Sequence, residues 1–226
     1  MRRYLLLVFF TFIQFLQAQQ SDFKNIDFTK AENNAERYKG EELTNLPILA
    51  HHLTYTLDTD VERFRAIYYW VCHNIKGEYG MMLKNNRKRQ KLKDNPEALH
   101  AWNHEFKRKV FKKLINDKET LCTGYAYLIK ELSRLAGLEC KIINGYGLDG
   151  SLKSKNLEMP NHSWNVIKLN GKWYVCDATW SSGFTDVTTE LFEFDYDNSY
   201  FLMDPSVFIK THQPEDEAWT LLPQKL

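Results

Sequence analysis

Residues 161–180, "NHSWNVIKLNGKWYVCDATW", predict a β-hairpin and decide how the rest of the sequence is interpreted. Asn170-Gly171 lies between two runs with alternating apolar residues, which is the strongest short-range signal for a two-residue turn. With the turn at these residues, Leu169 faces Lys172 and, further along the ladder, Trp164 faces Asp177. The turn therefore sets the register of both strands.

This register brings His162 and Asp177 to the same face of the predicted hairpin. Side chains two apart on a strand share a face, so His162 and Trp164 both lie on the side of Asp177. His162 is then the diagonal neighbour of Asp177, about 7–8 Å away at the backbone, within reach of an imidazole and a carboxylate. Asp177 can accept from one ring nitrogen and leave the other to act as a base. Cys176 faces the opposite side and is interpreted as a packing residue.

Cys122 falls in the first turn of a predicted amphipathic helix and is the candidate nucleophile. Unsatisfied backbone N–H groups and the helix dipole stabilise a thiolate at this position, and the same groups can receive an oxyanion. Gly124 permits a close approach to the backbone. Taken alone, Cys122 could equally be a structural thiol, and His162 with Asp177 a surface pair. Together the three have the composition of a Cys-His-Asp acyl-transfer site.

Helices are expected before the strands. Thr59 and Glu62 form a capping-box pattern ahead of a helix that ends near Ile75, and a second helix is expected from about Pro96 to Ile115. The Cys122 helix ends at Gly137. After it come a short strand over 140–148 and the hairpin. Runs of helices followed by antiparallel strands indicate an α+β fold in one domain.

The N-terminus has the pattern of a secretory signal peptide. Arg2 and Arg3 precede the apolar run "YLLLVFFTFIQFL", and the small Ala18 follows. We expect residues 1–18 to be the signal, 19–44 a loosely packed lead-in, and 45–226 the folded domain. This predicts a secreted or periplasmic protein without a membrane span after cleavage. An uncleaved N-terminal anchor is the alternative.

Composition narrows the classes of partner. The chain has 226 residues, 43% hydrophobic content and a net charge of +1, which fits a globular domain with a substantial core. Residues 84–113 form a basic helical excursion, with eleven Lys or Arg against Asp94, Glu97 and Glu105. A solvated charged face is the simpler explanation, and contact with an anionic glycan, nucleic acid or membrane is the alternative. Nothing in the block resembles a nucleic-acid module.

The remaining cysteines and histidines predict no metal site and no cofactor. His100 and His104 have a spacing that can bind a metal, but no carboxylate or Cys accompanies them. His212, in "THQPED", is interpreted as a turn residue. Cys72 is expected in the core. Cys140 and Cys176 could form a disulfide that leaves Cys122 free.

Several of these stretches together resemble the core of the transglutaminase-like superfamily. They are "LCTGYAYLIKELSRLAGLECKIINGYG" followed by "NHSWNVIKLNGKWYVCDATW", with "DTDVERFRAIYYWVCHNI" before and "YFLMDPSVFIKTHQPEDEAWTLL" after. More narrowly, they are similar to its kyphoscoliosis-peptidase-type branch, over roughly residues 45–223. The stretch "ETLC" departs from the Gly and small apolar residue common before the Cys, and the basic excursion is longer than usual.

The resemblance implies a papain/transglutaminase-like core, with the nucleophile helix packed on a small antiparallel sheet. It implies Cys122 as nucleophile, His162 as base and Asp177 as orienting acid. The residues expected to shape or pack the site are Gly124, Tyr125, Trp164 and Trp180. We therefore expect an exported cysteine peptidase or acyltransferase that forms a thioester with a peptide or protein amide. A cell-envelope association would be compatible with this.

Two other hypotheses stay open. One is a peptide- or glycan-binding module that keeps the fold. The other is a different Cys-His-Asp acyltransferase, similar to arylamine N-acetyltransferases, which the tryptophan-rich hairpin fits poorly.

Overall fold

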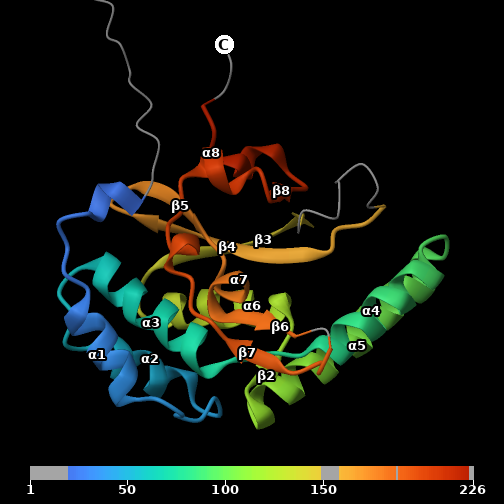
Figure 1. The fold of residues 1–226 in the computed structure, drawn as a ribbon, viewed down its shortest axis with the longest axis horizontal. Coiled ribbons are helices and arrows are strands. Elements are labelled where there is room, and N and C mark those ends of the chain that lie inside the picture. Colours follow the sequence, from blue (N-terminus) through green and yellow to red (C-terminus); the bar gives the residue numbers. More distant parts are fainter. Residues whose placement is uncertain (1–19, 149–157, 187, 224–226) are drawn as a thin grey trace, which may run out of the picture.

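A helical layer covers one face of a four-stranded antiparallel sheet in the computed structural model, which describes residues 20–148, 158–186 and 188–223 (Figure 1). The predicted signal peptide, residues 1–18, lies outside the described residues. The α-helices are α1 (Thr29–Arg37), α2 (Leu46–Thr54), α3 (Asp60–Asn74), α4 (Tyr79–Leu92), α5 (Pro96–Asp117), α6 (Cys122–Leu135), α7 (Ala178–Ser182) and α8 (Pro205–Phe208). Short 3-10 helices are η1 (Gln20–Phe23), η3 (Asn198–Tyr200) and η4 (Glu217–Thr220). The α+β class expected from the sequence is confirmed.

The main sheet has the strand order β5-β4-β3-β8, and every neighbouring pair is antiparallel. Its strands are β3 (Glu139–Gly147), β4 (His162–Leu169), β5 (Lys172–Cys176) and β8 (His212–Pro214). Two small ribbons accompany it: parallel β1 (Lys76–Gly77) with β2 (Glu119–Thr120), and antiparallel β6 (Gly183–Thr185) with β7 (Phe192–Phe194).

The β4–β5 hairpin has the register predicted from its turn, with Leu169 paired to Lys172 and Asn165 to Cys176. Asn170 and Gly171 both have positive φ, at 51° and 79°, as a type I′ turn requires. The ladder ends at Cys176. The predicted pairing of Trp164 with Asp177 is absent because the chain leaves the sheet there and begins α7.

The two faces of the sheet have different partners. Ile167, Leu169, Tyr174 and Cys176 join the main core, where α6 packs on β3 and β4 and contacts α2 and α3. The opposite face carries a smaller cluster around Trp164, Val166 and Phe208. Figure 1 shows α8 on this second side, away from the helical layer, while β8 is the edge strand next to β3. His162, at the start of β4, is therefore placed where the sheet, α6 and the C-terminal segment meet.

The lead-in is part of the core, which corrects the expectation that residues 19–44 pack loosely. Ala31 and Ala35 of α1 are buried, and α1 packs on α3. Glu32 forms a 2.6 Å ion pair with the buried Arg65 of α3. The polar composition of this segment is misleading because two alanines one helical turn apart are enough for close packing on α3.

The basic excursion is a helical hairpin made by α4 and α5, which projects from the body of the molecule (Figure 1). Pro96 begins α5 as predicted, and the helix continues to Asp117. None of the α4 side chains is buried. Arg89 of α4 donates to the carbonyl of Pro160 at 2.9 Å, which ties the hairpin to the segment before β4. The hairpin thus forms a wall beside the start of β4.

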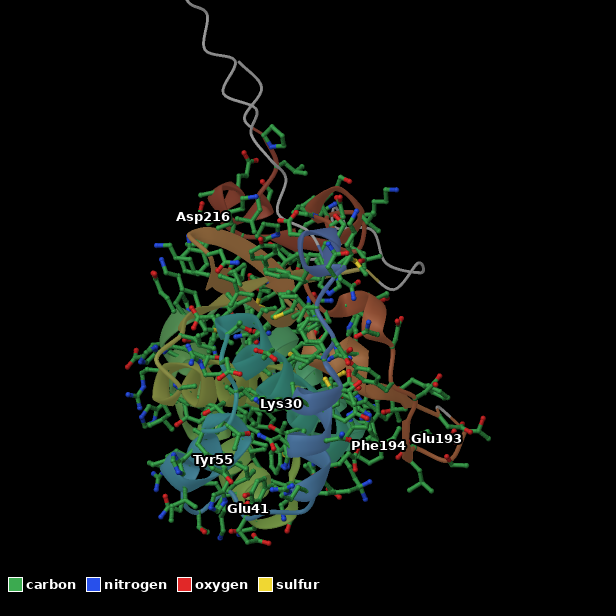
Figure 2. The ribbon with its side chains drawn as sticks, turned by 90° about the vertical axis from the view of Figure 1, so that its left-hand side faces the viewer. Lys30, Glu41, Tyr55, Glu193, Phe194 and Asp216 are labelled. Atoms are coloured by element: carbon green, nitrogen blue, oxygen red, sulfur yellow. The ribbon has the colours of Figure 1, made fainter. Side chains whose placement is uncertain are left out.

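The β6–β7 ribbon forms a second projection. Figure 2 shows Glu193 and Phe194 at its outer edge, away from the helical layer where Lys30, Glu41 and Tyr55 lie. Phe184 and Phe194 are 51% and 47% exposed. Within the described residues, no helix combines the length and the apolar character needed to cross a bilayer.

Candidate active site

Cys122 is the first residue of α6, as predicted, and follows Leu121 as N-cap. The backbone N–H groups of Cys122 and Thr123, the first two of the helix, have no partner inside it, whereas that of Gly124 already donates to the Leu121 carbonyl at 2.8 Å. A Cβ added at Gly124 would lie 1.9 Å from the hydroxyl oxygen of Thr120, which is fully buried. Glycine at position 124 therefore permits strand β2 to pack tightly against the start of α6.

His162 and Asp177 form a buried hydrogen bond of 2.6 Å between imidazole Nε2 and carboxylate Oδ2. His162 is 9% exposed and Asp177 1%. Since an ionised carboxylate only accepts hydrogen bonds, Nε2 carries the proton. The other ring nitrogen, Nδ1, is not engaged by Asp177 and is left available to a neighbouring group. Cys122 and His162 line the same cleft, and Asp177 holds the His162 ring from its other side.

The environment favours the charged form of His162. Burial alone would lower the pKa of the imidazole, but the Asp177 carboxylate and the Cys122 side chain outweigh it and raise the pKa to about 10. Burial likewise acts to raise the pKa of Asp177, yet His162 and His212 hold it well below its usual range.

Asp177 is also the N-cap of α7. Its Oδ1 accepts from the backbone N–H of Thr179 at 2.8 Å and of Trp180 at 3.4 Å. Tyr68 of α3, which is fully buried, donates its hydroxyl to the Asp177 carbonyl at 2.9 Å. One carboxylate oxygen is therefore held by the helix N-terminus, and the other is presented to histidine. The run Asp177-Ala178-Thr179-Trp180 is therefore explained by the cap and the start of the helix.

His212 is a site residue, and its interpretation as a turn residue was wrong. It is the first residue of β8, is fully buried, and approaches Asp177 Oδ2 at 3.0 Å through its own Nε2. Burial lowers the pKa of His212, although its bond to Asp177 opposes this. No local pattern marks this role, because it depends on β8 pairing with β3, far from the hairpin in sequence.

The three groups His162, Asp177 and His212 have the composition of a metal site, with ligand atoms within 4.8 Å of one another. Their separations from Oδ2, 2.6 and 3.0 Å, are those of direct hydrogen bonds. Two ligands of one tetrahedral zinc ion would lie roughly 3.3 Å apart, since each is about 2.0–2.1 Å from the metal. The cluster is therefore interpreted as a hydrogen-bonded one.

Cys122 and His162 open onto a cleft of about 1100 Å³. Its walls come from the α4–α5 hairpin, the start of α6, the start of β4 and the β6–β7 ribbon. The apolar and aromatic lining is extensive: Tyr79, Met82, Phe106, Val110, Phe111, Tyr127, Trp180, Phe184, Phe192 and Tyr200. Charged residues are fewer: Glu78, Arg89, Lys107 and Glu215. Such a lining suits a bound polypeptide segment that has apolar side chains and a few polar groups.

The four residues expected to shape the site divide into two groups. Trp180 lines the cleft and lies 5.5 Å from the His162 ring, centroid to centroid. Trp164 is 1% exposed and packs beneath His162 against Phe208. Tyr125 is buried and donates to the carbonyl of Ile75 at 2.7 Å. These two, like Gly124, support the site from inside the protein.

The cysteines other than Cys122 are structural. Cys72 and Cys176 are buried, and Cys140 is half-buried. All four are free thiols, so the disulfide considered between Cys140 and Cys176 is not formed. Burial raises the pKa of Cys72 and of Cys140 to about 12. Cys122 is the cysteine that lines the cleft.

These observations define a class: a mixed helix–sheet protein with a Cys at a helix start and a buried His–Asp pair at the mouth of a cleft. Comparison with known proteins supports this class. Residues 48–178, more than half of the chain, match the family model of the transglutaminase-like superfamily. The chain belongs to this superfamily, which confirms the resemblance seen in its sequence.

Named relatives extend the similarity to most of the chain. Human kyphoscoliosis peptidase is 32% identical over 208 residues, which are 90% of this chain and 28% of that protein. The mouse protein of the same name is 34% identical over 74% of this chain and 23% of that protein. Hillarin of Drosophila melanogaster is 25% identical over 87% of this chain and 23% of its own length. The chain thus spans about a quarter of the length of these relatives.

Proposed function

We propose that this protein is a cysteine enzyme that acts on peptide or protein amides through Cys122, His162 and Asp177. The observation that carries the proposal is the position of Cys122 at the N-terminus of α6, on a cleft, beside the buried His162–Asp177 pair. Each part has a chemical role in acyl transfer, and the relatives named as peptidases support the same class.

In the proposed first half-reaction, the thiolate of Cys122 attacks the amide carbonyl carbon and forms the C–S bond. The carbonyl oxygen becomes an oxyanion, which backbone N–H groups at the start of α6 can stabilise. His162 then gives its Nδ1 proton to the leaving nitrogen as the C–N bond breaks. An amine or ammonia departs, and a thioester remains on Cys122.

In the second half-reaction, water or an amine attacks the thioester, and His162 accepts the proton of the nucleophile at Nδ1. The C–S bond breaks, and the pair of Cys122 thiolate and His162 imidazolium is restored. Water yields hydrolysis, as in a peptidase or amidase, and an amine yields transamidation. Asp177 holds the imidazole by Nε2 in both halves, which leaves Nδ1 free to give and take the proton.

The test is a screen of peptide pools, with and without a fluorescent primary amine, followed by mass spectrometry of Cys122. We expect cleaved or amine-labelled peptides and a thioester adduct on the enzyme. Cys122→Ala should abolish both, whereas the matched variant Cys140→Ala should retain them. Peptide retention without turnover and without an adduct would instead favour a non-catalytic binding module with the same fold.

We further propose that the enzyme acts outside the cytoplasm. The support is the N-terminal pattern of Arg2, Arg3, an apolar run and Ala18. N-terminal sequencing of the mature protein should start near Gln19. A protein that begins at Met1 and fractionates with the cytoplasm would contradict this proposal, whereas an intact N-terminus in the membrane fraction would indicate an uncleaved anchor.

A further inference from the structure

We propose that His212 is a positioning residue of the candidate active site: a neutral imidazole that donates to Asp177 Oδ2 and holds the carboxylate in place for His162. This inference rests on the proposed function, because the residue it serves is the His162–Asp177 pair. His212 does not line the cleft, so its effect on the chemistry would pass through Asp177.

The first support is convergence on one atom. Asp177 Oδ2 accepts from His162 Nε2 at 2.6 Å and from His212 Nε2 at 3.0 Å, and Oδ1 accepts from Thr179 and Trp180. The carboxylate is thus held by four donors and is 1% exposed. Without His212, Oδ2 would have only one side-chain donor, His162, to define its position.

The second support is the built environment of the His212 ring. Phe208 stacks on it with ring centroids 3.9 Å apart and an angle of 18° between the planes. Trp180 and Trp164 approach it at 4.4 and 5.2 Å. A fully buried imidazole enclosed by aromatic rings has little freedom to rotate, so its N–H direction is fixed before any substrate binds.

The third support is the strand between the two histidines. In the sheet, β3 separates β4 from β8, and Gly145 pairs with His162 while Gly147 pairs with His212. A Cβ added at Gly147 would approach the His162 side chain to 3.1–3.3 Å. Glycine at this position leaves room for the two imidazoles to converge on Asp177.

The hydrogen bonds also specify the tautomer of His212. Nε2 faces a carboxylate and must donate, so it carries the proton. Nδ1 lies 2.9 Å from the Thr211 hydroxyl, whose single proton can go to Nδ1 or to the Phe208 carbonyl at 3.3 Å. A neutral ring protonated at Nε2 satisfies the carboxylate, and the shorter contact with Thr211 is satisfied when the hydroxyl donates to Nδ1. Burial among aromatic rings favours this form because it lowers the pKa of His212.

The hydrogen bond from His212 to Asp177 Oδ2 has an electrostatic consequence. It stabilises the ionised carboxylate, so Asp177 stays charged at lower pH than it would with His162 alone. The other titratable groups that face His212 are His162 on β4 and Tyr200 on η3, at ring-centroid distances of 5.4 and 6.1 Å. Loss of His212 should therefore affect the acid side of the pH profile.

The experiment measures the rate of Cys122 alkylation by iodoacetamide between pH 2 and 9, a window that reaches below the usual pKa of a carboxyl group because the pKa of Asp177 is lowered. In His212→Phe, we expect the acid limb to move up by about one pH unit, because the carboxylate loses one of its donors. The rate on that limb should then be about tenfold lower. His212→Gln, which keeps an N–H donor, should recover most of the shift. His100→Phe, at an exposed position of α5, is the matched control and should leave the profile unchanged.

A folded His212→Phe protein with the wild-type profile would overturn the inference. If that variant fails to fold, Thr211→Val keeps His212 but removes the hydroxyl at Nδ1 and should shift the same limb by a smaller amount; an unchanged profile would again count against the role. Nitrogen-15 spectra of the wild-type imidazoles give an independent answer. A His212 ring that is charged, or protonated only at Nδ1, at pH 7 would also overturn it.

The same data separate the two proposals. If wild-type alkylation is indifferent to His162→Ala, the proposed function fails, and the positioning role fails with it. If alkylation depends on His162 but not on His212, only the positioning role fails.

Discussion

The side-chain amide of Asn165 in β4 donates to the backbone carbonyl of Ala126 in α6 at 3.0 Å. Asn165 lies on the strand of His162, and Ala126 lies one helical turn after Cys122. The same amide donates to the carbonyl of Lys141 in β3 at 3.2 Å. This buried side chain therefore joins the helix of the candidate nucleophile to the strands of the candidate base, a link that the hairpin pattern alone did not indicate.

We predict that Asn165→Leu lowers the free energy of unfolding by about 1–3 kcal/mol, because the substitution leaves buried carbonyl groups without this donor. Urea denaturation measures the change. Asn116→Ala, at an exposed position of α5, should change stability by less than about 0.5 kcal/mol. Equal unfolding midpoints for Asn165→Leu and wild type would show that the link contributes nothing.

The second prediction concerns pH. The folded-state pKa of His162, about 10, lies above the unfolded value of about 6.5, so its contribution to stability is complete below pH 6.5 and is lost as pH rises toward 10. The contribution of His162 to stability should therefore fall between pH 6.5 and 8, with a slope approaching one proton per molecule. Urea midpoints across this window measure it, below the range where the buried thiols titrate.

His162→Gln is the matched variant for this titration, because it keeps a polar side chain without an ionisable ring. The slope between pH 6.5 and 8 should be smaller in this variant than in the wild type by the contribution of one proton. Parallel curves for the two proteins would mean that His162 does not gain a proton on folding.

The residues that the sequence predicted well are those whose placement is local. The Asn170-Gly171 turn specifies the β4–β5 register, the capping box specifies the start of α3, and the apolar stripe after Cys122 specifies α6. Each depends on residues only a few positions apart. The family resemblance added the expectation that these pieces belong to one site, and the family match confirms the superfamily.

The residues that were missed depend on contacts between distant segments. His212 reaches Asp177 only because β8 adds to the edge of β3, and Asn165 bonds to α6 only because the sheet packs on that helix. Asp177 as the cap of α7 had a local signal, an Asp before "ATWSS", but the alternation of the hairpin favoured continuing the strand. Competition between two local patterns is decided by tertiary packing.

The third prediction uses two helical glycines. Gly124→Ala should destabilise the protein by about 1–3 kcal/mol and slow Cys122 alkylation, since the new Cβ would collide with Thr120. Gly80→Ala in α4 meets only the end of the Glu78 side chain, at 3.3 Å, and should stabilise by about 0.5–1 kcal/mol through helix propensity. Thr120→Ala should recover part of the loss in the Gly124→Ala background. Similar thermal shifts for both glycine variants would contradict the proposed close approach.

The fourth prediction concerns the thiols. With the native protein and a disulfide reagent at pH 8, Cys122 should react fast because it lines the cleft, whereas Cys72, Cys140 and Cys176 should react slowly because burial raises the pKa of each. In urea, without reductant, four thiols should titrate. Peptide mapping assigns the fast thiol, and Cys122→Ala should remove the fast phase only. Two thiols in urea would instead indicate a disulfide between Cys140 and Cys176, which would require the strands around Asn165 to rearrange because its side chain contacts the Cys140 sulfur at 3.6 Å.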